Sequence, residues 1–240
     1  MKDKLKTILK RSPKIYNLVK KGYSTFHNSC YKLKFHLFGT KFEEKYWINK
    51  KDDIRDCWKS INHPHRNFLM EKICKFSPSN ILEVGSSCGP NLRLLAKKFP
   101  NAKIVGIDVN PVAVKRGNEL FAQQDVSNVK LLFGKAYELE QFRDESFDVV
   151  FTDAVLIYIG PDKIRKAIEE MLRVTNQALI LLEWHSKSNP LGVYVGHWMR
   201  DYATLLKEFI PENKIRITKL PGGLWGGNWQ KYGAVIEAIK

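Results

Sequence analysis

The sequence lacks any apolar run near the roughly 20 residues that a helix needs to span a bilayer. Its N-terminus is basic, but no apolar stretch of about 7 to 15 residues follows, so we do not expect a secretory signal. It also lacks internal repeats and low-complexity tracts. These absences argue against membrane-spanning and secreted proteins and favour a cytoplasmic globular protein.

Cysteine is scarce, and its spacing fits no metal site. The chain has four cysteines in 240 residues, with no C-x-x-C pair and no histidine at ligand spacing. We therefore expect reduced thiols and no metal at the scattered positions Cys30, Cys57, Cys74 and Cys88.

Acidic residues are rare at the start of the chain. Residues 1–50 hold thirteen Lys or Arg against three acids, whereas the other 190 residues carry 27 against 22. The net charge of +15 therefore lies mainly in this segment, and the apolar content of 44% is ordinary for a folded protein. We predict a basic extension over residues 1–50 and one α/β domain over residues 51–240.

The first 40 residues alternate lysines with large apolar groups. These recur at three- and four-residue steps, typical of an amphipathic helix. Such a helix can lie on an anionic membrane surface, or it can pack on the core or on a second subunit. Nucleic acid is a third, less favoured partner, since lysines and aromatics also serve phosphates and bases.

The segment Asn80 to Asn91 predicts a strand, a tight turn and a helix. Its apolar run ends at Val84, Gly85 and Gly89 then free the backbone, and Pro90 suits the first helical position. Such a turn passes close beneath a ligand, and the helix N-terminus favours an anionic group.

Downstream, short apolar runs alternate with helical patterns, as in a parallel sheet covered on both faces. The glycine-rich link at residues 221–229 predicts a final hairpin. The expected strands are 103–109, 129–133, 146–152, 177–183, 214–220 and 233–239, and the expected helices are 91–98, 111–124, 162–174 and 198–209.

The glycine turn selects between two nucleotide-type cofactors. A dinucleotide fingerprint needs glycine where this chain has Ser87 and Pro90. The spacing is instead E-x-G-x-x-x-G, which resembles motif I of class I S-adenosylmethionine-dependent methyltransferases, and the resemblance continues for about 100 residues. It implies a Rossmann-like three-layer α/β sandwich, with a seven-stranded mostly parallel sheet whose last strand is antiparallel, and S-adenosylmethionine as cofactor.

The same resemblance assigns cofactor contacts. Asp108 ends the second strand, 23 positions after Gly85, where an acid accepts hydrogen bonds from ribose hydroxyls. Glu83 is expected near the methionine end, held by N–H groups of residues 85–89, while Thr152 and Asp153 are candidates for the ammonium group. The predicted cofactor-binding set is Glu83, Gly85, Ser86, Gly89, Asn91, Asp108, Val109, Ala136 and Asp153.

One position departs from the family pattern. Family members usually carry an acid in a Gly-Asp-Ala-like triplet that accepts from the adenine amino group, but here the triplet is Gly134-Lys135-Ala136. Lysine only donates hydrogen bonds, so this contact must come from elsewhere, such as a backbone group near Ala136 or Tyr137.

Methyl transfer to a hydroxyl needs a base that removes a proton. The candidates are His185, two residues after the fifth strand, and His65 in the helix before motif I. A histidine after a strand is also often a plain loop residue. Trp184 and Tyr158 are predicted to wall the substrate.

The residues after the fourth strand narrow the choice of acceptor. Nucleobase-amine methyltransferases carry Asn or Asp, then Pro-Pro and an aromatic residue there, whereas this chain has Asp153-Ala154-Val155, and no cysteine comes next. RNA and DNA are therefore disfavoured. The basic, aromatic-rich leader that ends Phe38-Gly-Thr-Lys-Phe-Glu-Glu-Lys-Tyr-Trp47 resembles those of methyltransferases of surface-polysaccharide assembly. This resemblance implies a glycan or other small molecule methylated on oxygen, at the inner membrane face. A nicotinamide-dependent oxidoreductase and a non-catalytic binding module remain as alternatives.

Overall fold

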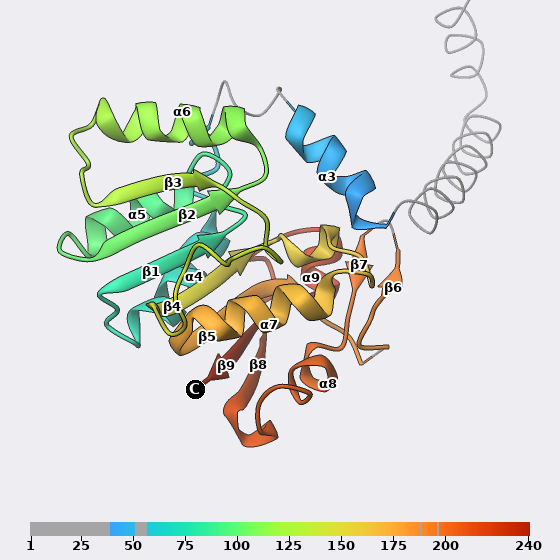
Figure 1. Ribbon diagram of the computed structural model, residues 1–240. Coiled ribbons are helices and arrows are strands. Elements are labelled where there is room, and N and C mark those ends of the chain that lie inside the picture. The colour runs from blue at the N-terminus through green and yellow to red at the C-terminus, as the bar shows by residue number, and fades with distance from the viewer. Residues whose placement is uncertain (1–38, 51–56, 188, 196) are drawn as a thin grey trace, which may run out of the picture.

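The computed structural model describes residues 39–50 and 57–240, apart from 188 and 196. Its centre is a seven-stranded sheet in the order β3-β2-β1-β4-β5-β9-β8 (Figure 1). The first five are parallel, and β9 runs antiparallel to both β5 and β8. The fold class predicted from the sequence is confirmed. The strands are β1 Asn80–Val84, β2 Lys103–Asp108, β3 Val129–Phe133, β4 Phe147–Asp153, β5 Thr175–Trp184, β8 Ile215–Lys219 and β9 Gly233–Ile239.

Helices cover both faces of the sheet because successive strand residues point to opposite sides. Leu82 and Val84 pack in one core with α7 and α8, whereas Ile81 packs in the other with α4, α5 and α6. These two cores make the three-layer sandwich that the resemblance implied. The helices are α3 Thr40–Asn49, α4 Pro64–Cys74, α5 Pro90–Lys98, α6 Pro111–Ala122, α7 Ile164–Val174, α8 Tyr202–Leu206 and α9 Asn228–Tyr232.

The expected helix over residues 198–209 is wrong in its first part. Trp198–Met199 form strand β7, which pairs with β6, Val193–Tyr194, and only α8 is helical. The rings of Tyr194 and Trp198 meet edge to face at 5.4 Å. This aromatic contact between paired strands stabilises the small hairpin. A helix that began at Trp198 would lack the strand pairing that brings the two rings together.

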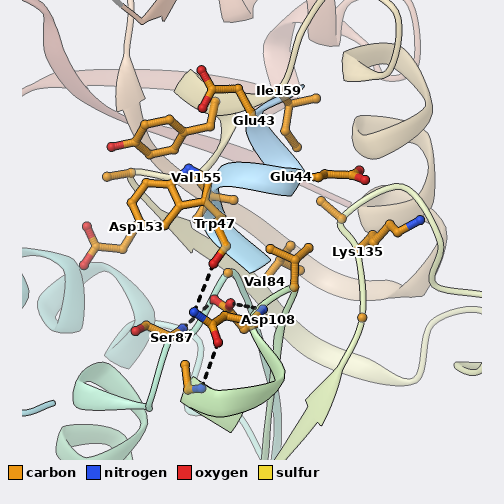
Figure 2. Close-up of a pocket in the computed structure, with 18 of the residues that line it drawn as sticks. Glu43, Glu44, Trp47, Val84, Ser87, Asp108, Lys135, Asp153, Val155 and Ile159 are labelled. Atoms are coloured by element: carbon orange, nitrogen blue, oxygen red, sulfur yellow. Dashed lines mark hydrogen bonds between the residues drawn. The ribbon is translucent and has the colours of Figure 1, made fainter. Parts of the chain in front are cut away.

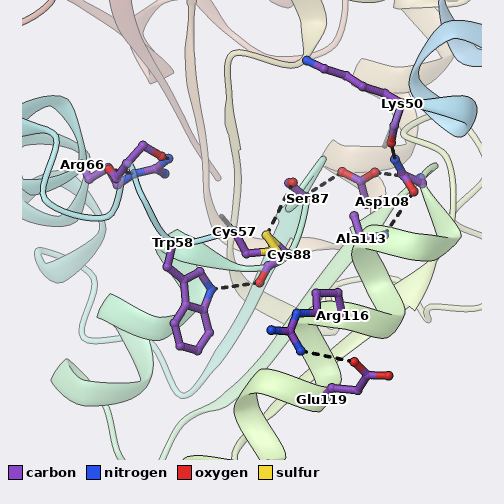
Figure 3. Close-up of a disulfide and its surroundings, with 12 residues drawn as sticks. Lys50, Cys57, Trp58, Arg66, Ser87, Cys88, Asp108, Ala113, Arg116 and Glu119 are labelled. Carbon is purple, nitrogen blue, oxygen red and sulfur yellow. Dashed lines mark hydrogen bonds and ion pairs between the residues drawn. A yellow bond between two sulfur atoms is a disulfide. The ribbon is translucent and has the colours of Figure 1, made fainter. Parts of the chain in front are cut away.

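Two cysteines are paired, which corrects the expectation of reduced thiols. Cys57 and Cys88 form a disulfide with their Cα atoms 5.8 Å apart, and Trp58 Nε1 donates to the Cys88 carbonyl oxygen at 3.1 Å (Figure 3). The bond ties the segment before α4 to the glycine turn. Sequence spacing missed it because the two residues are 31 positions apart and meet only in the fold. Cys74 is a free thiol.

Helix α3 belongs to the predicted N-terminal extension, yet it is fastened to the core at both ends. Thr40 Oγ1 donates to Asp162 Oδ1 at 2.7 Å and accepts from the Gly160 amide at 3.1 Å. At the other end, Asn110 Nδ2 donates to the carbonyl oxygens of Trp47 at 3.0 Å and Lys50 at 2.8 Å. α3 therefore lies across the carboxyl ends of the strands.

Within the described part of the chain, no helix combines the length and apolarity needed to cross a bilayer. The predicted amphipathic segment covers residues 1 to about 40, and its positions 1–38 lie outside the described residues.

Candidate functional site

A cavity of about 480 Å³ opens at the carboxyl ends of β1, β2, β3 and β4, beneath α3 (Figure 2). This volume is within the range of small-molecule and cofactor sites. Its position agrees with the rule that open α/β sheets bind ligands at the carboxyl ends of their strands. Six residues predicted from the sequence line it, namely Gly85, Asp108, Val109, Ala136, Asp153 and Tyr158.

The glycine turn forms the floor of this cavity. Gly85 has φ +77°, and a Cβ atom there would lie 2.3 Å from Val155 Cγ2, so no side chain fits. The amides of Gly85 and Ser86 both donate to the Ile107 carbonyl oxygen, at 2.8 and 2.9 Å. Gly89, with φ +81°, is the N-cap of α5. The turn therefore exposes backbone atoms of Gly85 to the cavity. Ser86 and Gly89 are not part of the cavity lining.

Asp108 is oriented by backbone amides. Ser87 N donates to its Oδ2 at 2.7 Å, and Asn110 N donates to its Oδ1 at 2.8 Å. Burial raises the pKa of this carboxyl group. Each carboxylate oxygen has a further lone pair, so the two can accept from adjacent hydroxyls, as the ribose assignment requires.

The carboxylate of Asp153 is buried, and only one of its two oxygens accepts hydrogen bonds from the described residues. Its Oδ2 accepts hydrogen bonds at 3.0 Å from His65 Nε2, Arg66 Nη1 and Asn91 Nδ2. Burial alone would raise the pKa of Asp153, but the hydrogen bond from His65 and the charges of His65 and Arg66 lower it. Its Oδ1 is buried and has no hydrogen-bond partner in the described part of the chain. A buried acceptor in this state suits a ligand that supplies a donor, such as an ammonium group.

The Glu83 carboxyl group accepts its hydrogen bond from the Asn91 side chain and not from the glycine turn. Asn91 Nδ2 donates to Glu83 Oε1 at 2.7 Å, and Asn91 Oδ1 accepts from Arg66 Nη1 at 2.6 Å. The expectation that amides of residues 85–89 bind Glu83 is wrong at Gly85 and Ser86, whose N–H groups bind Ile107. Burial raises the pKa of Glu83 to about 8. Glu83 and Asn91 thus support Asp153 from behind the cavity.

The raised pKa of Glu83 makes stability depend on pH. Between its ordinary value of 4.5 and about 8, the folded protein holds a proton that the unfolded chain has released. Stability is therefore expected to fall as pH rises through this window, by up to about 1.4 kcal/mol per pH unit. Urea titrations from pH 5 to 8 measure this slope, and Glu83→Gln should reduce it to the part due to Glu183, whose pKa burial raises to about 7. An equally steep slope in the variant would assign the effect to other groups.

The two predicted bases do not line the cavity. His65 is buried, with Nε2 on Asp153 and Nδ1 2.5 Å from His63 Nδ1, so it positions Asp153. His185 Nδ1 accepts from the Tyr202 amide at 3.3 Å, at the start of α8. Trp184 is also outside the lining, and a further imidazole, His197, lies between it and Tyr158, with ring centroids 5.0 Å from both.

Sequence reasoning missed the contribution of α3. Glu43, Glu44 and Trp47 line the cavity, and the Trp47 ring meets Tyr158 at 4.8 Å. A signal was present, because Glu43 and Glu44 are two of the three acids in the first 50 residues. Two adjacent acids in an otherwise basic segment indicated that this part of the segment has a different role from the residues before it.

Two buried charged side chains hold the loop after β4, which borders the cavity. Glu183 Oε1 accepts from Thr152 Oγ1 at 2.8 Å and from the amides of Val155 and Leu156 at 3.0 and 2.9 Å. Its Oε2 accepts from the Ile157 amide at 3.2 Å. The guanidinium of Arg200 donates to the carbonyl oxygens of Leu156 and Ile159. Glu183 and Arg200 are fully buried, so they fix the backbone that carries Tyr158.

Comparisons with known proteins agree with this geometry. Residues 81–178 match the methyltransferase domain family. A probable tocopherol O-methyltransferase from rice, Oryza sativa, is 36% identical to this chain over 110 residues. The aligned residues cover 45% of this chain and 29% of the rice protein. The aligned part thus spans only about a third of the curated relatives first matched.

Solved structures share the fold at low identity. A SAM-dependent methyltransferase from Aquifex aeolicus has a TM-score of 0.56 at 19% identity, over 79% of this chain and 99% of that one. Geranyl diphosphate C-methyltransferase from Streptomyces coelicolor, solved with S-adenosyl-L-homocysteine, has a TM-score of 0.61 at 10% identity, over 83% and 97%. Residues 81–178 of this chain therefore match the methyltransferase domain family, and the chain shares its fold with solved SAM-dependent methyltransferases.

Proposed function

We propose that this protein transfers a methyl group from S-adenosylmethionine to a hydroxyl group of a small molecule. The observation that carries the proposal is the cavity that joins Asp108 to the open Oδ1 of Asp153 across the glycine turn. When bound, the cofactor supplies an activated methyl group, so the protein needs only to bind, orient and deprotonate.

The residues present fit this cofactor. Asp108 is assigned to the ribose hydroxyls and Asp153 Oδ1 to the ammonium group. Gly85 leaves room between them, since any side chain there would meet Val155. Arg66, which also lines the cavity, has its guanidinium at the Asp153 end, where the carboxylate of the methionine part would lie. The donor and acceptor groups thus complement an amino acid at one end and a sugar in the middle.

Aromatic side chains define the acceptor side. Trp47 and Tyr158 line the cavity near Asp153, and His197 packs against Tyr158. Rings of this kind bury apolar or planar groups and the faces of sugar rings. Burial lowers the pKa of His197, so its imidazole is neutral near pH 7 and can accept a proton. His197 lies outside the cavity lining, as His65 and His185 do, so we assign none of these three histidines as the base.

The cofactor assignment is tested with Asp108→Ala. The variant loses the acceptors for two ribose hydroxyls, so the dissociation constant for S-adenosylhomocysteine in calorimetry should rise by about tenfold or more. The matched control is Asp125→Ala, which changes an exposed acid outside the cavity and should leave the constant unchanged. Unaltered binding by Asp108→Ala would refute the ribose contact.

The finer proposal concerns the acceptor. A glycan hydroxyl is supported by the aromatic walls and by the resemblance of the leader to those of polysaccharide-associated methyltransferases. A mass increase of about 14 Da in a surface glycan from cells that hold the gene, absent from cells that lack it, is the expected result. Transfer only to non-sugar hydroxyls would leave the methyltransferase proposal intact and remove the glycan.

The basic leader is proposed to bind an anionic membrane surface. Residues 1–40 combine lysines with aromatic and aliphatic groups, and each lysine near anionic headgroups adds about 1 kcal/mol. Co-sedimentation with phosphatidylserine vesicles should be lost when residues 1–38 are deleted, a change that keeps Thr40, the anchor of α3. Undiminished co-sedimentation would contradict the proposal.

A further inference from the structure

The β3 end of the cavity presents lysine where the adenine amino group is expected to find an acceptor. Strand order places Asp153 on β4, Gly85 after β1, Asp108 on β2 and the triplet 134–136 after β3. A cofactor with its amino acid at Asp153 and its ribose at Asp108 therefore directs its base toward the triplet. Lys135 has only donors there, and its Nζ donates to Glu138 Oε1 at 3.1 Å.

An acid on α3 faces the same end of the cavity. Glu44 lines the cavity, and its carboxylate points toward Lys135 from across the pocket (Figure 2). Its Oε1 is buried and finds no hydrogen-bond partner among residues 39–50 and 57–240, with 188 and 196 set aside. Burial raises the pKa of Glu44, while the charge of Lys135 opposes that shift. A buried acceptor without a donor is unfavourable, and a ligand amine would supply the missing donor.

We propose that Glu44 accepts a hydrogen bond from the exocyclic amino group of the bound adenine. The acid that the triplet lacks is thereby supplied by the helix that covers the cavity, and it selects a 6-amino purine over a 6-oxo purine. This inference rests on the proposed cofactor. The anchors of α3 at Asp162 and Asn110 fix the position of Glu44 relative to Asp108 and Lys135.

The test compares two ligands by calorimetry: S-adenosylhomocysteine and S-inosylhomocysteine, which has an oxo group in place of the amino group. The wild-type protein should bind the amino ligand at least about tenfold more tightly, because the 6-oxo group has no hydrogen to donate to Glu44. Glu44→Ala should weaken the amino ligand about tenfold and leave the oxo ligand within about twofold. A structural role for Glu44 would weaken both ligands equally, which overturns the proposal.

Two further variants test the same hydrogen bond if Glu44→Ala perturbs folding. Glu44→Gln can donate as well as accept, so its preference for the amino ligand should fall by about threefold or more. Adding Lys135→Asp to Glu44→Ala returns an acid to the triplet and should restore binding of the amino ligand. Unchanged preference in Glu44→Gln overturns the assignment.

The control on the same helix is Lys45→Ala, an exposed position outside the cavity lining, which should leave both constants unaltered. Failure of the wild-type protein to bind either ligand would instead overturn the cofactor assignment, and the Glu44 contact with it. Tight binding of S-adenosylhomocysteine without discrimination between the two ligands would overturn only the role of Glu44.

Discussion

Replacing Asp153 with asparagine is expected to weaken binding of S-adenosylhomocysteine by about 10- to 150-fold. The carboxylate meets three donors on Oδ2 and leaves Oδ1 for the ligand. An amide has one acceptor oxygen, so its NH₂ group must face either Arg66 and His65 or the ligand ammonium. Each arrangement loses a charge-assisted hydrogen bond, worth about 1.5 to 3 kcal/mol, and places donors against donors. Calorimetry on the purified variant measures the loss.

The control for this variant is Asp148→Asn. Asp148 lies on the same strand and accepts from the amides of Ser79 and Asn80 at 2.8 and 2.9 Å, as expected of a structural acid, and it is outside the cavity. It should lower stability without changing ligand affinity. Equal affinities for the wild-type protein and a folded Asp153→Asn variant would show that this carboxylate does not hold the ligand.

Glu183→Ala is expected to reduce the free energy of unfolding by about 3 to 5 kcal/mol. The substitution leaves Thr152 Oγ1 and three loop amides without their acceptor, and it removes the carboxylate whose charge acts on the buried guanidinium of Arg200. Because the same loop carries Tyr158 past the cavity, ligand affinity should fall as well. Urea denaturation followed by circular dichroism gives the change in stability.

Glu208→Ala is the matched control for this effect. Glu208 pairs with Arg165 on the surface, where ion pairs contribute about 0 to 1 kcal/mol. Glu183→Gln, which retains an acceptor oxygen, should fall between the two alanine variants. A loss from Glu183→Ala no larger than that from Glu208→Ala would mean that the buried carboxylate does not hold the loop.

The sheet was predictable because most of its strands can be recognised from a short apolar run in the sequence. Apolar runs such as residues 178–182 are buried on both faces, and the helices between the strands begin at Pro90 and Pro111, which suit a first helical position. The segment from Trp198 failed this reading because an aromatic contact across the β6–β7 hairpin outweighed helical periodicity. Local pattern therefore predicts the sheet and misses contacts between residues that are distant in the chain.

The cavity was predictable where a residue sits at a strand end. Asp108 was expected from its strand end and from the family resemblance, and Asp153 from the resemblance, and the carboxyl ends of parallel strands meet at one edge. The Cys57–Cys88 pair and the place of Glu44 did not follow, since each depends on how an N-terminal segment lies on the core. His65 was expected close to the site, and in the structure its Nε2 binds Asp153.

A crystal structure with S-adenosylhomocysteine tests the central claim most directly. We predict both ribose hydroxyls within about 3 Å of the Asp108 carboxylate and the ammonium group on Asp153 Oδ1, with the homocysteine chain passing over Gly85. An Asp108 side chain turned to solvent, with the ligand elsewhere on the surface, would contradict the account.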